Sequence, residues 1–186
     1  MSESVYAQLI GLSAGTLLLT AVLLVWRRSL VASIRLLSVQ GVALATLVAV
    51  IGVHERDAQL VVVSVLVLAL KGVGLPWVLT PGARAGVARE ESPLLNPTAA
   101  LITASVLTIL AYLVSPPLIG AADDAAVRAV PLAIALVLIG FLLLVTRRRA
   151  LSQLVGFLLL DNGIAAVAFL TSGGLPLVVE LGASLD

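Results

Sequence analysis

The sequence contains no cysteine and a single histidine, His54, and these absences restrict its chemistry. Without thiolates the chain cannot form a disulfide framework or hold an iron–sulfur cluster, and one histidine cannot complete a Cys/His zinc site. Neither a GxGxxG fingerprint nor a Walker-type phosphate loop occurs, and the arginines form no nucleic-acid patch. We therefore expect no catalytic centre, cofactor or metal within this chain, and we expect His54 to be a solvated loop residue.

Charged residues are also scarce. Only 11% of the 186 residues are charged and 61% are hydrophobic, with a mean hydropathy of +1.20. A soluble domain carries about 25% charged residues, and a chain this short leaves much of its surface in contact with its solvent. That solvent must be lipid here, so the sequence predicts an integral membrane protein.

The apolar residues fall into seven runs, separated mostly by short polar joints. Because about 20 residues span the hydrocarbon core as a helix, we predict an all-α helical bundle of about seven transmembrane helices that forms a single transmembrane domain over residues 1–186. The last run is too short to cross a bilayer, so we expect this helix to be incomplete in the given sequence. The predicted spans are about 6–26, 30–53, 58–79, 97–118, 127–145, 150–171 and 175–186.

Arginine counts predict the orientation of these spans. The joints after spans one, three and five carry seven arginines, and those after spans two and four carry two. Cytoplasmic loops are enriched in basic residues, so we expect an N-terminus outside the cell and basic loops in the cytoplasm. The first span is expected to be a retained helix, because no basic residue precedes it, whereas a signal peptide begins with basic residues. The seven arginines are Arg27, Arg28, Arg84, Arg89, Arg147, Arg148 and Arg149.

Four charged residues lie inside apolar runs: Arg35, Lys71, Asp161 and Glu180. A charge at mid-membrane costs about 2.5–3.5 kcal/mol on insertion scales, so each of them requires a partner or a hydrated cavity. Two are basic and two are acidic, so they can neutralise one another across helices. The four are therefore the candidate residues of a proton path.

Lys71 precedes Gly72, Gly74 and Pro76, which weaken the third helix and free backbone carbonyls. This setting indicates a proton-handling lysine, and the alternative is a structural ion pair between two helices. Arg35 allows two interpretations as well. Its long side chain either reaches the cytoplasmic interface, or it extends a wetted path with Ser38 and Gln40.

Asp161 and Glu180 share their helix faces with small residues, which indicates contact with other helices rather than with lipid. Burial in hydrocarbon favours the uncharged acid, whereas a neighbouring Lys71 favours the carboxylate, so the two effects compete. Such competition allows a carboxylate to accept and release protons. The alternative is that both residues only hold helices together by hydrogen bonding.

The region from Gly156 to Asp186 resembles the C-terminal part of the component E membrane subunit of hydrogenase-4 and formate hydrogenlyase-type complexes. The resemblance rests on an Asp-Asn-Gly-Ile motif at 161–164, a Leu-Pro pair at 175–176 and a Glu-Leu-Gly motif at 180–182. The segments 71–76 and 89–94 resemble the middle of that subunit. Asp161 stands where the family usually has glutamate, and its side chain is one methylene shorter.

That family is similar to the K-type subunit of respiratory complex I and the C-type subunit of cation/proton antiporters, which carry one glutamate in each of two adjacent helices. Asp161 and Glu180 match these glutamates by motif position. The resemblance implies a proton-coupling subunit in the membrane arm of a redox complex in a prokaryotic plasma membrane, with antiporter-like and redox-arm subunits as partners. An antiporter subunit, a structural scaffold and a free-standing transporter remain the alternatives.

Overall fold

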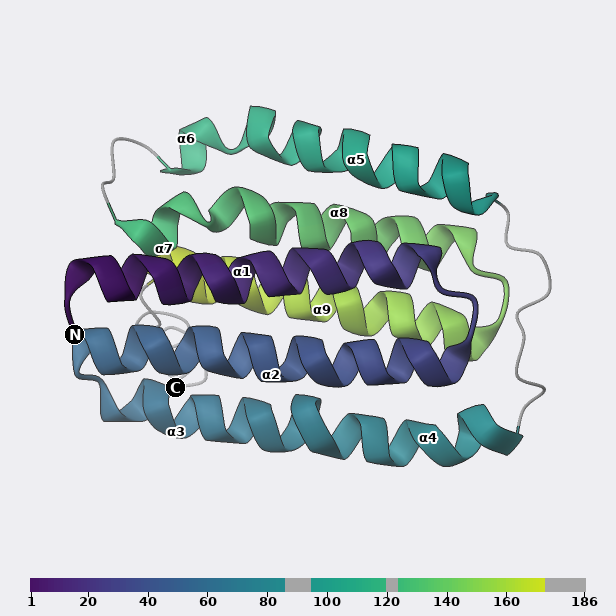
Figure 1. Cartoon of the computed structure of the whole chain (residues 1–186), viewed down its shortest axis with the longest axis horizontal. Helices are drawn as coiled ribbons and strands as arrows, with labels where there is room; N and C mark the ends of the chain where they lie inside the picture. The colour runs from purple at the N-terminus through teal and green to yellow at the C-terminus, as the bar shows by residue number, and fades with distance from the viewer. Residues whose placement is uncertain (86–94, 120–123, 173–186) are drawn as a thin grey trace, which may run out of the picture.

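The computed structural model describes residues 1–85, 95–119 and 124–172, which form helices packed side by side (Figure 1). Within these ranges there is no β-strand, so the described part is all-α, as predicted. The helices in chain order are α1 (Glu3–Trp26), α2 (Leu30–Glu55), α3 (Ala58–Val67), the π-helix η1 (Leu68–Gly74), α4 (Leu75–Ala85), α5 (Pro97–Val114), α6 (Pro116–Ile119), α7 (Ala125–Arg128), α8 (Val130–Thr146) and α9 (Ala150–Ser172).

Six helical stretches in the described ranges are long and apolar enough to cross a membrane. They coincide with the first six predicted spans, to within a few residues at most ends. The predicted seventh span, 175–186, lies outside the described residues, so the count of seven stays a prediction. The six stretches are Glu3–Trp26, Leu30–Glu55, Ala58–Gly82, Pro97–Val114, Ala125–Thr146 and Ala150–Thr171.

Two helix ends differ from the approximate bounds of the predicted spans. The fourth span does not continue as one helix to residue 118, because α5 ends at Val114 and the short α6 begins at Pro116. Pro116 and Pro117 have no backbone N–H to donate to the carbonyls of α5, although Ser115 between the two helices keeps helical backbone angles. The second helix continues through His54 to Glu55, so the predicted loop around His54 starts too early. The His54 ring stacks on Tyr6 of α1, with ring centroids 3.9 Å apart, and its Nε2 lies 3.6 Å from Glu3 Oε1.

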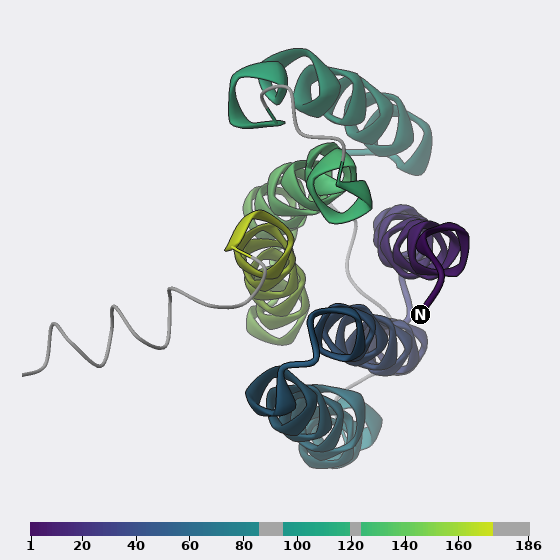
Figure 2. The same ribbon diagram turned by 90° about the vertical axis from the view of Figure 1, so that its left-hand side faces the viewer.

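The helices differ in how much of their surface the bundle covers. About half of the residues in the apolar parts of α1, α2, α8 and α9 are buried. In the α3–η1–α4 stretch only 11% of these residues are buried, and in α5 only 17%. Figure 2 shows α5 and the α3–η1–α4 stretch at opposite edges of the bundle, outside the other four helices. The inner helices therefore form the core, which includes Leu17, Leu24, Leu44, Leu47, Leu136, Ile139 and Leu159.

Glycines set the distance between α8 and α9. A Cβ at Gly140 would lie 2.6 Å from the Leu160 backbone nitrogen, and a Cβ at Gly163 would lie 2.7 Å from that of Val137. Gly156 is equally close to Leu144. The two backbones therefore touch directly, in the manner of small-residue contacts between membrane helices.

We expect Gly140→Ala to destabilise the chain by about 1–3 kcal/mol, because the added methyl group forces α8 and α9 apart. Gly11→Ala is the matched control, since a Cβ at Gly11 meets no described atom within 4 Å. It should leave stability unchanged or raise it by up to about 1 kcal/mol through the helix propensity of alanine. Thermal unfolding in detergent compares the two variants, and equal melting temperatures would contradict the packing argument.

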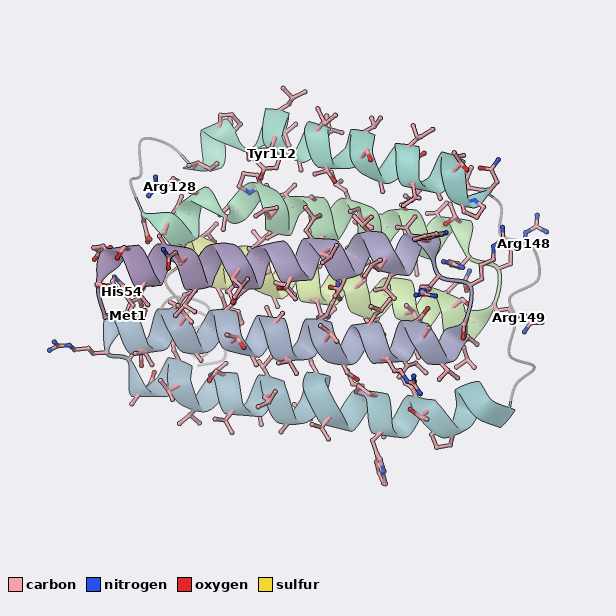
Figure 3. All side chains as sticks on the ribbon, in the orientation of Figure 1. Met1, His54, Tyr112, Arg128, Arg148 and Arg149 are labelled. Carbon is pink, nitrogen blue, oxygen red and sulfur yellow. The ribbon has the colours of Figure 1, made fainter. Side chains whose placement is uncertain are left out.

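The helix ends match the alternation that the orientation prediction requires. Helices α1, α4 and α8 end at one end of the bundle, where α2, α5 and α9 begin (Figure 1). Figure 3 shows Arg148 and Arg149 at that end, and Met1, His54 and Arg128 at the other. Which end faces the cytoplasm stays a prediction from the arginine counts.

Candidate functional site

Lys71 lies in the middle of the π-helix η1. Pro76 has no N–H to donate to the backbone carbonyl four residues earlier, and its ring collides with that carbonyl in a regular α-helix. The π-helix widens the turn before Pro76, and the Leu75 N–H donates to the Leu70 carbonyl, five residues earlier. The weak point expected after Lys71 is therefore a widened turn in a continuous helix. Such π-turns are frequent at functional sites.

Gly41 of α2 supports the backbone of this turn. A Cβ at Gly41 would lie 2.4 Å from the Lys71 carbonyl carbon and 2.5 Å from the Gly72 nitrogen. Such distances are too short for any Cβ, so only glycine lets α2 and η1 approach this closely. The contact fixes the height of Lys71 along the bundle.

The Lys71 ammonium bonds to two successive residues of α9. Its Nζ donates to Asp161 Oδ2 at 2.5 Å and to Asn162 Oδ1 at 3.0 Å. Lys71 and Asp161 thus form an ion pair between segments 90 residues apart in the sequence. The structure brings these two of the four candidate residues together.

The hydrogen bonds continue from Asn162 into the core. Asn162 Nδ2 donates to Gln40 Oε1 at 3.1 Å, and Gln40 Nε2 donates to the Leu17 carbonyl at 3.2 Å. Gln40 is fully buried and Asn162 is 3% exposed. We call Asp161, Lys71, Asn162 and Gln40 the polar chain. It connects η1, α9 and α2 and ends on the backbone of α1.

The polar chain is open at its Asp161 end. The Asp161 side chain is 48% exposed and that of Lys71 is 19% exposed. The prediction that Asp161 faces the bundle is therefore only partly right, because one carboxylate oxygen meets Lys71 while about half of the side chain faces outward. A crevice beside Lys71 separates α4 from α9, and its lining comprises Ile34, Leu37, Lys71, Leu75, Pro76, Leu79, Leu158 and Asn162.

The other two candidates are not part of the polar chain as described. Arg35 is exposed on α2, five residues before Gln40. Glu180 lies outside the described residues, so its expected partnership with Asp161 is untested. Within the described ranges, no group of three or more His, Cys, Asp or Glu side chains is placed to hold a metal ion.

Sequence reasoning gave no role to Asn162 and an incomplete one to Gln40. Gln40 was expected to add polarity near Arg35, but its side chain bonds to Asn162 instead. The available signal was that both amides lie inside apolar runs, where an unpaired polar group is costly. That signal indicates a partner for each amide without saying which one.

Comparison with known proteins gives two kinds of relative. The chain is 45% identical to the uncharacterized protein Rv0085 of Mycobacterium tuberculosis, over all of this chain and 86% of the relative. It is 27% identical to hydrogenase-4 component E of Escherichia coli K12, over 93% of this chain and 81% of the relative, and the Shigella flexneri protein gives the same values. No protein-family model and no solved structure matches the chain.

Proposed function

The chain belongs to the same family as the mycobacterial protein Rv0085, and we propose that it is a membrane-arm subunit of a hydrogenase-like or complex I-like redox complex. In this proposal the subunit forms part of the path that couples redox chemistry to proton translocation. Electron transfer belongs to its partners, since this sequence lacks the cysteine ligands of an iron–sulfur cluster. The similarity to hydrogenase-4 component E and the six apolar helices support the proposal.

The observation that carries the coupling role is the Lys71–Asp161 ion pair at the open end of the polar chain. A lysine and an aspartate in contact can exchange a proton, and the exchange turns two opposite charges into two neutral groups. The pair can thus hold or release a proton according to what approaches its exposed side.

The amides of the polar chain have a different task. Asn162 accepts from Lys71 with its oxygen and donates to Gln40 with its nitrogen, so it holds the lysine in a fixed direction. Amide side chains do not ionise in the physiological range and therefore do not store protons. We assign Asn162 and Gln40 positioning roles, and Lys71 and Asp161 the role of transient carriers.

The route beyond the pair follows from the sequence. We propose that Glu180 is the next carrier after Asp161, and that Arg35 lies toward the cytoplasmic entrance. The proposed surroundings are a prokaryotic plasma membrane, with the N-terminus outside and antiporter-like subunits beside the chain. The exposed apolar side chains of the peripheral helices, among them Val62, Val65 and Trp77, suit a lipid or subunit contact in that setting.

Two other functions are compatible with the same ion pair. In a purely structural scaffold the pair only holds η1 against α9. In the C-type subunit of a multisubunit cation/proton antiporter, the carriers are similar but no redox arm is present. The composition of the purified complex separates the antiporter from the redox proposal, and a pair of substitutions considered below separates the scaffold.

We expect the affinity-tagged chain, purified in mild detergent from its own membranes, to carry antiporter-like membrane subunits together with a redox arm containing metal centres. Mass spectrometry identifies the subunits, and metal analysis of the same sample detects the redox arm. Untagged membranes taken through the same purification are the control. Recovery with antiporter subunits but no redox arm would favour the cation/proton antiporter, and recovery of the chain alone would contradict both.

A further inference from the structure

Arg147 has a structural role at the end of the bundle where α1, α4 and α8 terminate. It is 7% exposed, and its Nη2 donates to the backbone carbonyls of Leu24 at 3.1 Å and Arg27 at 2.9 Å. These carbonyls belong to the last turn of α1 and its C-cap, which have no partner further along the helix. Arg147 thus joins α8 to α1, and it also places a guanidinium beneath the exposed Arg27 and Arg28.

A pocket lies beside Arg147 between four helix ends. We call it the arginine pocket. Arginines from the α1–α2 joint and from the end of α8 form one part of its wall, and apolar and hydroxyl side chains form the rest. Its lining comprises Arg27, Arg28, Leu30, Ser33, Leu143, Arg147, Ser152 and Val155.

The electrostatics of the arginine pocket favour an anion. Three arginines are among its lining residues, and no carboxylate is among those of its described wall. Ser33 and Ser152 belong to the first turns of α2 and α9, so the positive ends of two helix dipoles face the same space. Arginine also bonds phosphate with two parallel N–H donors, which makes a phosphate group the best match.

An apolar crevice continues from the arginine pocket along the bundle. Leu30 and Val155 line both, and the remaining walls of the crevice come from Ile34, Leu79 and Leu151. This apolar crevice follows α2 between α4 and α9. It lies next to the crevice at Lys71, and Ile34 and Leu79 line both. An apolar crevice offers no charge or hydrogen bond to a free phosphate, whereas a phosphate that carries a hydrocarbon chain fits both the pocket and the crevice.

We propose that the arginine pocket and the apolar crevice together bind an anionic phospholipid. Its phosphate lies against the guanidinium groups of Arg27 and Arg28, and one acyl chain lies over Leu30, Ile34 and Leu79. The site lies at the helix ends, where headgroups are found, and Trp26 is 60% exposed at the same level, as interfacial anchors are. Basic pockets between transmembrane helices bind anionic headgroups in this way.

The test measures the thermal stability of the purified full chain in non-ionic detergent during titration with single lipids. Dioleoyl phosphatidylglycerol should raise the melting temperature, and dioleoyl phosphatidylcholine should not. Arg27→Gln/Arg28→Gln should weaken the apparent phosphatidylglycerol affinity by roughly thirtyfold, because each basic residue near an anionic surface contributes a factor of about five to the affinity. Arg148→Gln/Arg149→Gln removes the same charge from residues outside the pocket lining, and it should change this affinity less than threefold.

Two further arms distinguish the sources of the phosphate. Inorganic phosphate and glycerol 3-phosphate should stabilise the chain far less than phosphatidylglycerol does, and equal stabilisation would overturn the lipid assignment. Equal losses in the two double variants would overturn it as well, because net charge alone would then explain binding. If Arg27→Gln/Arg28→Gln does not fold, native mass spectrometry of the wild-type chain decides instead, since equal retention of the two lipids contradicts the proposal.

Discussion

Replacing Lys71 by methionine or Asp161 by asparagine is expected to weaken assembly of the complex and to abolish its proton translocation. The double replacement is expected to restore assembly without restoring translocation. Each single variant leaves one charge without its partner in the membrane. Removing one member of a buried ion pair costs about 3–5 kcal/mol, and we expect about 2–3 kcal/mol here because Asp161 is half-exposed. The double variant has no unpaired charge, and neutral replacement of an ion pair is often tolerated.

The three variants separate a proton carrier from a scaffold. Native gels of the membranes report assembly, and dye-monitored acidification of inverted vesicles reports translocation with the electron donor that the purified complex uses. Arg148→Gln and Glu55→Gln are matched controls, since they remove one basic and one acidic charge at exposed positions near the helix ends. A double variant that regains both assembly and translocation would show that the pair only holds helices together.

Gly41→Ala is expected to reduce translocation and stability together, although it adds one methyl group and removes no polar atom. The new Cβ would lie 2.4 Å from the Lys71 carbonyl carbon and 2.6 Å from its oxygen. Because these are backbone atoms, no side-chain rotation relieves the contact, and η1 must move away from α2. We expect a cost of about 1–3 kcal/mol, which is typical of overpacking, and longer distances from Lys71 to Asn162 and Asp161.

Gly15→Ala provides the control for this prediction. A Cβ at Gly15 meets no described atom within 4 Å, so the substitution should lower neither the stability of the chain nor translocation by the complex. Thermal unfolding of the purified chain gives the stability difference, and vesicle acidification gives the effect on the complex. If Gly41→Ala retains wild-type translocation, close contact between α2 and η1 is not required for the proton path.

Sequence reasoning found the charged members of the site and missed the two amides that connect them to the core. Lys71 and Asp161 were identifiable because charges inside apolar runs are costly and therefore rare. Sequence reasoning also named Lys71 as the cation beside the acidic residues, and the structure places its Nζ on Asp161 Oδ2. Asn162 and Gln40 carry no charge, and their pairing depends on two helices that are 122 residues apart at that point.

The sequence by itself determined the solvent of this protein, the positions of its first six helices and the residues whose charge needs an explanation. Membrane thickness fixes the length of a span, and each helix in lipid satisfies its own backbone hydrogen bonds, so these features are local. Only the tertiary structure decided that Lys71 faces Asp161 and Asn162, that Asp161 stays half-exposed, and that Arg147 caps α1. Such pairings depend on how closely helix backbones approach one another. Glycines such as Gly41 and Gly163 set that distance, and each of them contacts a segment distant in the sequence.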